Sequence, residues 1–594
     1  MTAPNRATLW GEVLVEELAA AGLSAACVSP GSRSTPLTVA LADHPEVTVY
    51  SHLDERSSAF FALGRGRRTG RPTAVVCTSG TAAANFHPAV LEASEARVPL
   101  VVLTADRPPE LRDSGANQTS DQVKLYGDAV RWYRTLPEPE PEPRKLRSLR
   151  VAADRAIAEA TGTPAGPVHL NVPFRKPLEP TPVPGDVPES LSTEAPPATG
   201  GRDGPFVRTA AGRTAPGDSE VATLADALGA AERPLIVCGP ADPAVHGPTP
   251  EALGRVVETT GAPVLADPLS GHRFGAHVPD LPVCGGYDSY LDADGWPDPD
   301  PDVVLRCGAS PTSKVLRQYL RDADARQVLV DPAGGWREAE FTATDLVVAD
   351  PTPTFASLAD AVSDRRDDAA ADGEVAAWRD RFVDSEDRYW SLVGEACRAS
   401  FFEGAILREL ARTAPDPATL FVSNSMPVRD LDRFGRPRGG DLTVLGNRGV
   451  SGIDGIVSTA LGAGSATEDP LVLVTGDLAY YHDMNGLLAL GRCGVDATVV
   501  LVNNDGGGIF HMLPIEEFDP PFTEHFVTPH DLDFEPTADI YDLEFARVAG
   551  RSAFLDAFET SVASAGTQVI EVRTDAESSH RTRECLHGRV CAEL

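Results

Sequence analysis

Lysine is nearly absent from this chain of 594 residues: it occurs only at Lys124, Lys145, Lys176 and Lys314, and arginine supplies the other cations. With 87 acidic against 52 basic side chains, the formal net charge at pH 7 is −35. A chain this acidic repels a nucleic-acid backbone, so we expect no nucleic-acid partner. Abundant Asp and Glu with little Lys also suit a salty environment that screens their repulsion, and a halophilic-type surface is our hypothesis.

Long apolar runs and a leader-like start are missing as well. No run approaches the roughly 18 residues that span a bilayer, so we expect no transmembrane segment. The N-terminus "MTAPNRATLW" has no basic stretch followed by an apolar one, and no secretory signal is expected. The nine cysteines are scattered and odd in number, which is typical of reduced thiols. These features predict a cytoplasmic protein.

Short apolar runs that end in Gly, Ser or Asp alternate with helical patterns along the chain, as in "TAVVCTSG", "PLIVCG" and "LVLVTGD". Such alternation predicts parallel sheets covered by helices on both faces. We therefore expect an α/β fold with three doubly wound parallel-sheet domains. The predicted parts are an α/β domain over 1–185, a Pro/Gly-rich linker over 186–220, a central α/β domain over 221–365, a helical connector over 366–400 and a third α/β domain over 401–594.

Polar side chains follow two buried strands of the third domain. One apolar run ends on Gly476-Asp477, and the next ends on Asn503-Asn504 with three glycines close behind. The spacing is about one strand–helix–strand crossover, so both side chains can converge at one sheet edge. A carboxylate and an amide oxygen suit Mg²⁺, and glycines let the backbone approach a phosphate. Alone, either dipeptide is better explained as a helix N-cap or a turn, but the pair favours a metal–diphosphate site.

The pair resembles the metal–diphosphate motif of thiamine-diphosphate enzymes, in which Gly-Asp is followed by Asn after a gap in the high twenties. More segments are similar to one branch, the 2-succinyl-5-enolpyruvyl-6-hydroxy-3-cyclohexene-1-carboxylate synthases of menaquinone biosynthesis. These segments are "SPGSRSTPL", "HLDERSSAFFALG", "TSGTAAAN", "LTADRPPELR", "GANQTSDQ", "SNSMPVRDLD", "GNRGVSGIDG" and "NNDGGGIFHMLP". The resemblance covers nearly the full length and is weakest in the linker and central domain. It implies the three-domain fold of these enzymes.

The resemblance implies thiamine diphosphate and Mg²⁺ as cofactors. Glu55, at the first turn of a helix, would be the catalytic residue and would hydrogen-bond the aminopyrimidine ring; alone, it is better explained as a glutamate that favours the helix dipole. The implied metal ligands are Asp477, Asn504 and Gly506. The other implied cofactor contacts are Asn424, Ile453, Gly476, Ile509, Phe510 and Leu513, with Gly506 again among them. Asp505 replaces an asparagine that is frequent in relatives, and its role is left open.

Arginines follow several of the predicted strands, and a guanidinium fork binds carboxylates bidentately. The family's substrates, 2-oxoglutarate and isochorismate, are both dicarboxylates. Any single arginine is better explained by pairing with a nearby Asp or Glu, but several in matching positions favour substrate clamps. The resemblance assigns 2-oxoglutarate to Ser425, Arg429 and Arg448. It assigns isochorismate to Ser32, Arg33, Arg107, Gln118 and Lys314.

The implied reaction is decarboxylation of 2-oxoglutarate followed by 1,4-addition of the succinyl unit to isochorismate. One alternative is another thiamine-diphosphate decarboxylase or carboligase, which would need fewer carboxylate clamps. A second is a non-catalytic paralogue, against which the joint presence of Glu55, Asp477 and Asn504 argues. Because the two cofactor ends need different domains, the resemblance also implies a homodimer, or a dimer of dimers, with its sites at the subunit interface.

Overall fold

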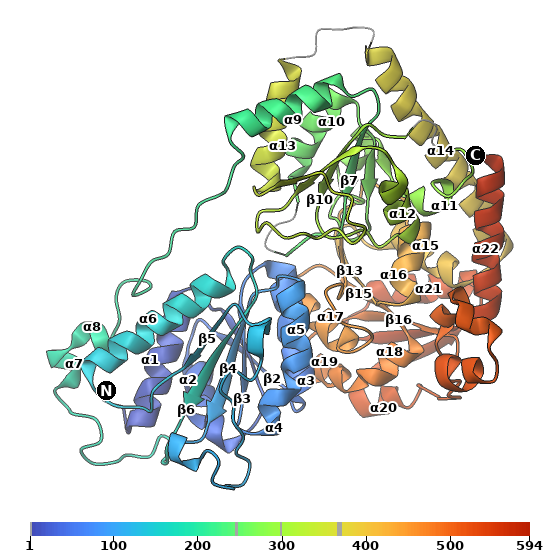
Figure 1. The fold of residues 1–594 in the computed structure, drawn as a ribbon. Helices are drawn as coiled ribbons and strands as arrows, with labels where there is room; N and C mark the ends of the chain where they lie inside the picture. The colour runs from blue at the N-terminus through green and yellow to red at the C-terminus, as the bar shows by residue number, and fades with distance from the viewer. Residues whose placement is uncertain (1–2, 244–246, 297–299, 365–370) are drawn as a thin grey trace. The chain divides into compact units, whose positions relative to one another are not determined.

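The computed structural model describes residues 3–243, 247–296, 300–364 and 371–594 (Figure 1). Three six-stranded sheets form its framework, and the strand pairs within them are parallel. The predicted α/β fold with three parallel sheets is thereby confirmed. Within these ranges, no helix is long and apolar enough to cross a membrane.

The internal contacts divide the chain into two compact units. The first unit comprises Met1–Gly212, Asn447–Glu468 and His482–Val495, and the second comprises Arg213–Gly446, Asp469–Tyr481 and Asp496–Leu594. The first sheet therefore lies in the first unit, and the central and third sheets lie in the second. The bounds of the five predicted parts remain predictions.

The first sheet has the strand order β2-β1-β3-β4-β6-β5. Its strands are β1 (Ala25–Val28), β2 (Thr48–Ser51), β3 (Thr73–Cys77), β4 (Leu100–Asp106), β5 (Trp132–Thr135) and β6 (Pro167–Pro173). The four inner strands are buried along their whole length, whereas β2 and β5 are partly exposed at the edges. The accompanying helices are α1 (Arg6–Ala20), α2 (Thr35–Asp43), α3 (Glu55–Thr69), α4 (Thr81–Asn85), α5 (His87–Glu95) and α6 (Pro143–Ala160).

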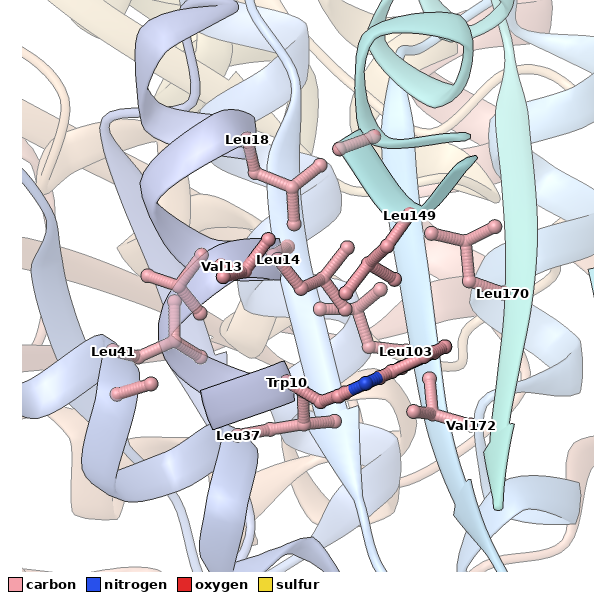
Figure 2. Packing of buried hydrophobic residues seen from close by; sticks show 14 of the residues in the cluster. Trp10, Val13, Leu14, Leu18, Leu37, Leu41, Leu103, Leu149, Leu170 and Val172 are labelled. Atoms are coloured by element: carbon pink, nitrogen blue, oxygen red, sulfur yellow. The ribbon is translucent and has the colours of Figure 1, made fainter. Parts of the chain in front are cut away.

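One face of this sheet is covered by an apolar layer that α1 supplies (Figure 2). Trp10 and Leu14 of α1 belong to one buried cluster with Leu103 of β4 and Leu170 of β6. The indole N–H of Trp10 donates to the carbonyl of Glu140 at 2.9 Å, so its single polar atom is satisfied. This packing fixes the sheet whose strand ends carry the candidate residues of the first unit.

The third sheet repeats the connectivity of the first, with the order β14-β13-β15-β16-β18-β17. Its strands are β13 (Ala418–Val422), β14 (Leu442–Leu445), β15 (Leu471–Gly476), β16 (Thr498–Asn503), β17 (Glu544–Val548) and β18 (Gln568–Arg573). The helices of this part of the second unit are α15 (Glu403–Thr413), α16 (Met426–Phe434), α18 (Asp477–His482), α20 (Thr537–Tyr541), α21 (Arg551–Val562) and α22 (Ala576–Glu593), whereas α17 (Ile456–Gly464) and α19 (Ala489–Cys493) belong to the first unit. In both sheets the winding direction reverses between the second and third strands in the order, and ligands bind at such switch points.

The central sheet has a different order, β12-β11-β10-β7-β8-β9, which is that of a doubly wound sheet with its switch point between β7 and β10. Its strands are β7 (Pro234–Cys238), β8 (Val264–Ala266), β9 (Val283–Cys284), β10 (Val303–Cys307), β11 (Arg326–Val330) and β12 (Asp345–Val347). Its helices are α9 (Asp218–Ala230), α10 (Pro250–Thr260), α11 (Tyr287–Tyr290), α12 (Lys314–Asp322) and α13 (Pro351–Ser363). The predicted linker contains the short helices α7 (Leu191–Glu194) and α8 (Pro196–Thr199), and α14 (Ala371–Ala399) occupies the predicted connector.

Helices α3 and α17 of the first unit touch through their backbones (Figure 1). A Cβ added to Gly64 of α3 would lie 1.9 Å from the carbonyl oxygen of Thr459, and one added to Gly462 of α17 would lie 1.9 Å from that of Phe61. No side chain fits at such distances, so both positions require glycine. This contact seats the segment after β14 against the helix that begins with Glu55.

Candidate active site

Asp477 joins the carboxyl ends of β15 and β16 in the second unit. Its side chain is 2% exposed, and Oδ1 accepts the N–H of Leu478 at 2.7 Å. Oδ2 accepts the N–H groups of Asn504 at 3.1 Å and of Gly506 at 3.0 Å, and Nε2 of His530 lies 3.4 Å away. Burial raises the pKa of Asp477 above its ordinary value, and these N–H groups oppose the rise.

The side chain of Asn504 presents a buried oxygen at the same strand ends. Its Nδ2 donates to Oε1 of Glu403 at 2.7 Å, and because a carboxylate only accepts, this contact settles which amide atom is nitrogen. Oδ1 is buried and has no hydrogen-bond partner among the described residues. Leaving a buried acceptor unpaired is costly, and a hard cation is a suitable partner for it. The donor set therefore fits the predicted Mg²⁺ site.

Glu403, on α15, was missed by the sequence reasoning. Its carboxylate is 2% exposed and also accepts the hydroxyl of Thr574 at 3.1 Å and Nη2 of Arg583 at 2.5 Å. Arg583 of α22 in turn binds both carboxylate oxygens of Asp430 on α16, at 2.7 and 2.5 Å. Glu403 lies 101 positions from Asn504 in the chain, so no local sequence motif could predict the contact.

Glycines and a left-handed residue shape the turn after β16. Gly506 has φ +143°, and a Cβ there would lie 2.1 Å from the carbonyl oxygen of Val527. Asp505 has φ +60°, and its Oδ1 accepts the N–H groups of His530 at 3.0 Å and Asp531 at 2.8 Å. Partial burial acts to raise the pKa of Asp505, but these N–H groups hold it below its ordinary value. Asp505 thus ties this turn to the loop at 530–531.

All other candidates of the second unit except Lys314 lie near the carboxyl ends of strands of the third sheet. Asn424 is buried after β13, and the carbonyl of Ser425, which has φ +69°, accepts Nη1 of Arg429 at 2.6 Å. Beside the backbone of Gly476 at the end of β15 there is open space, because a Cβ there would meet no atom within 4 Å. Ile509 and Phe510 lie on a 3-10 turn, Gly508–Met512, which ends at Leu513. Three adjacent strand ends therefore carry these residues.

Glu55 is the first residue of α3, as predicted, and lies in the first unit. Asp54 caps this helix by accepting the N–H groups of Arg56 at 2.9 Å and Ser57 at 3.5 Å. The Glu55 side chain is half-buried, and its carboxylate accepts no hydrogen bond from any residue that the structure describes. The capping role therefore belongs to Asp54, and the Glu55 carboxylate is not needed for it.

Arg33 and Arg107 lie close together after β1 and β4. The Arg33 side chain is 7% exposed, and its Nη1 donates to the carbonyl of Phe174 at 2.6 Å. Burial and the charge of Arg107 hold the pKa of Arg33 below its ordinary value, while Asp106 opposes them. Two neighbouring guanidinium groups at the carboxyl ends of parallel strands form a setting that favours an anion.

The remaining candidates are distributed over both units. Ser32 is exposed beside Arg33, and Gln118, with φ +54°, accepts the hydroxyl of Ser79 on its carbonyl at 3.0 Å. Lys314 is the exposed first residue of α12 in the second unit. Arg448 and Ile453 are half-buried in the segment between β14 and α17, which belongs to the first unit.

Comparison with known proteins identifies two regions of the chain. Residues 10–125 match the thiamine pyrophosphate enzyme N-terminal TPP binding domain, and residues 436–572 match the C-terminal TPP binding domain. The chain is 63% identical to the 2-succinyl-5-enolpyruvyl-6-hydroxy-3-cyclohexene-1-carboxylate synthase of Haloarcula marismortui over 100% of both chains. It is 64% identical to the synthase of Halobacterium salinarum over 99% of both, and 49% identical to that of Roseiflexus castenholzii over 98% of both. The chain belongs to this synthase family.

The synthase fold is shared with more distant thiamine-diphosphate enzymes. A solved structure of the Rhodococcus jostii RHA1 thiamine diphosphate-dependent 4-hydroxybenzoylformate decarboxylase aligns with a TM-score of 0.68. The alignment covers 95% of this chain and 99% of that chain at 19% identity, so it shows the fold alone. The two matched domains are those that carry Glu55 and the Asp477–Asn504 pair, so the synthase is a thiamine-diphosphate-dependent enzyme.

We predict that Asp477→Ala abolishes Mg²⁺-dependent binding of thiamine diphosphate, because the cation would lose its only carboxylate ligand. Glu403→Gln keeps all three proposed ligands but loosens the Asn504 amide, and should weaken binding about 10–100-fold, as loss of a partner behind a metal ligand does. Calorimetric titration of the apoprotein with and without Mg²⁺ measures both effects. Asp496→Ala, an exposed charge before the amino end of β16, should bind normally. Tight metal-dependent binding by Asp477→Ala would remove this residue from the site.

Proposed function

We propose that this synthase catalyses the Mg²⁺- and thiamine-diphosphate-dependent decarboxylation of 2-oxoglutarate and the 1,4-addition of the succinyl unit to isochorismate. The products would be 2-succinyl-5-enolpyruvyl-6-hydroxy-3-cyclohexene-1-carboxylate and CO₂, in menaquinone biosynthesis. The supporting observation is 63% identity over the full length to a synthase named for that product, together with the metal-suited oxygens at the ends of β15 and β16. No contact of the described residues favours a different 2-oxoacid chemistry.

Asp477 and Asn504 Oδ1, with the carbonyl of Gly506, would hold the Mg²⁺ that neutralises the diphosphate. The open space beside Gly476 would admit the diphosphate, because no Cβ narrows it. Asn424 would contact the cofactor, and the apolar side chains of Ile453, Ile509, Phe510 and Leu513 would wall its ring end and exclude water. When bound, thiamine diphosphate would supply a thiazolium that accepts the electron pair left behind when CO₂ departs.

Glu55 would be the catalytic residue and would share a proton with the ring nitrogen of the aminopyrimidine. Its side chain is half-buried at the start of α3. Because Asp54 already caps the helix, Glu55 can act on a ligand without loss of the cap. The proton that it holds would be returned within each turnover.

The charged side chains would divide the two substrates between them. Ser425, Arg429 and Arg448 would bind the carboxylates of 2-oxoglutarate, through the planar fork that a guanidinium presents. Ser32, Arg33, Arg107, Gln118 and Lys314 would bind isochorismate. The paired guanidinium groups of Arg33 and Arg107 support this assignment, because their mutual repulsion is relieved when a carboxylate binds between them.

A homodimer with its active sites between subunits is part of the proposal, and a dimer of dimers would contain the same sites. Glu55 belongs to the first unit and the metal ligands to the second, and each cofactor must reach both. Two reciprocal contacts would give two equivalent sites. We place the enzyme in the cytoplasm, where its cysteines, all free thiols in the structure, would stay reduced. High salt would screen its acidic surface.

Purified protein mixed with thiamine diphosphate, Mg²⁺, 2-oxoglutarate and isochorismate should form the succinylated product, identified by mass spectrometry. Glu55→Gln should bind the cofactor normally but lose about 10²–10⁴-fold in turnover, because an amide cannot share the proton. Glu46→Gln, an exposed glutamate before β2, is the matched control and should retain full activity. Near-normal turnover by Glu55→Gln would take away its catalytic role. Absence of the product with wild-type protein would overturn the proposed function.

The arginine clamps should be separable by substrate. Arg429→Ala and Arg448→Ala should slow 2-oxoglutarate consumption measured without isochorismate, because each removes a carboxylate clamp from the first half-reaction. Arg33→Ala and Arg107→Ala should spare that half-reaction and impair product formation. Single-turnover kinetics of the two halves distinguish these groups. One uniform defect across all four variants would refute the division.

Mixing inactive Glu55→Gln chains with inactive Asp477→Ala chains should restore activity if each site takes its two ends from different subunits. In a mixed dimer one site collects both lesions and the other collects neither. Random exchange gives about half mixed dimers, each with one intact site of two, so about a quarter of wild-type activity is the ceiling. Native mass spectrometry verifies the exchange, and exchange without recovery would place both ends in one chain.

A further inference from the structure

The segment between β14 and α17, residues 447–455, has neither helix nor strand, although it carries two of the proposed site residues. Arg448 would bind 2-oxoglutarate, and Ile453 would contact the cofactor. Val450 is 58% exposed, so this part of the loop projects from the surface of the first unit. A loop without regular structure depends on specific anchors for its conformation.

Glu92 of α5 is such an anchor, and its side chain is fully buried. Oε1 accepts the N–H of Gly449 at 2.9 Å. Oε2 accepts the N–H of Val450 at 2.6 Å and that of Ser451 at 2.9 Å. One carboxylate therefore binds three consecutive N–H groups of the loop, a contact between residues 357 to 359 positions apart in the chain.

Two neighbours support the contact between Glu92 and the loop: Arg67 pairs with its carboxylate, and Gly449 leaves room for it. Arg67 of α3, 7% exposed, forms an ion pair with Oε1 at 3.0 Å, which compensates the buried negative charge. A Cβ added to Gly449 would lie 2.8 Å from Oε2 of Glu92 and 3.1 Å from the nitrogen of Ala96. Glycine at 449 is therefore a condition of the contact.

We infer that Glu92 is a positioning residue, whose carboxylate sets the loop at 447–455 so that Arg448 meets 2-oxoglutarate and Ile453 meets the cofactor. The assignment of Arg448 and Ile453 rests on the proposed function, whereas the hydrogen bonds between Glu92 and the loop do not. Hydrogen bonds to an ionised acceptor are about twice as strong as neutral ones. An amide at this position would turn one acceptor into a donor that faces an N–H, and would leave buried groups unpaired.

Hydrogen–deuterium exchange of the full-length apoprotein tests the hydrogen bonds between Glu92 and the loop without any substrate. In Glu92→Gln, the amides of Gly449, Val450 and Ser451 should exchange at least about 10-fold faster, because a charge-assisted hydrogen bond is worth about 1.5–3 kcal/mol. Glu95→Gln removes the same charge from an exposed position on the same helix and should leave the exchange unchanged. Unchanged protection in Glu92→Gln would overturn the inference.

Steady-state kinetics of 2-oxoglutarate consumption test the functional step. Glu92→Gln should raise KM for 2-oxoglutarate about 10-fold, by loss of one such hydrogen bond. In an Arg448→Ala background the same substitution should raise KM little further, because residues that act through one another are not additive. Full additivity, or a KM equal to that of wild type, would refute positioning through Arg448. If the wild type consumed no 2-oxoglutarate, the proposed function would fail. The exchange result would still show whether Glu92 holds the loop.

A second variant covers the case in which Glu92→Gln does not fold. Gly449→Ala leaves Glu92 and Arg67 in place but pushes the loop away from the carboxylate. It should reproduce both the faster exchange at Val450 and Ser451 and the higher KM. Gly452→Ala is the matched control in the same loop, because its Cβ would meet no atom within 4 Å. Wild-type exchange in Gly449→Ala would contradict the inference.

Discussion

The carboxylate of Asp477 is the interaction on which the arrangement of the candidate metal site depends. Parallel strands bring their carboxyl ends to one edge, and the buried Asp477 binds the N–H groups of Asn504 and Gly506 across that edge. Those two hydrogen bonds bring the turn after β16 to the end of β15. A second carboxylate, Glu403, then fixes the Asn504 amide with its oxygen unpaired among the described residues. Two buried carboxylates, Asp477 and Glu403, therefore hold the backbone and the side chain of Asn504 in place.

Acidic residues also organise the loop that carries Arg448, although its sequence is rich in glycine. Glu92 accepts three N–H groups of this loop. The helix that follows the loop, α17, contacts the backbone of α3 through Gly64 and Gly462. Glycines thus allow the two helices to approach closely, and the Glu92 carboxylate orients the N–H groups of the loop. In both units a buried carboxylate binds a residue or loop of the proposed site: Glu403 binds Asn504, and Glu92 binds the loop that carries Arg448.

Local patterns were enough to predict three parallel sheets, the first-turn position of Glu55 and the strand-end positions of Asp477 and Asn504. Other strands give a weaker sequence signal: β5 and β17, at sheet edges, are partly exposed and form no continuous apolar run. β6 is fully buried, but polar residues such as Asn171, whose Oδ1 accepts the hydroxyl of Thr104 on β4, interrupt its apolar pattern. Glu403 and Glu92 could not be found, because their partners lie 101 and at least 357 positions away, and only the folded chain brings them together.

The identical strand order of the first and third sheets makes their strand ends comparable strand by strand. In the loop after the second strand in the order, the first sheet has Arg33 and the third has Ser425, and directly after the fourth strand the first has Arg107 and the third has Asn504. One strand order thus appears twice in a single polypeptide, with guanidinium groups at these two strand ends of the first sheet and a hydroxyl and an amide at the same ends of the third. The residues at equivalent turns, rather than the strand order, therefore set which chemical groups each sheet edge offers to a ligand.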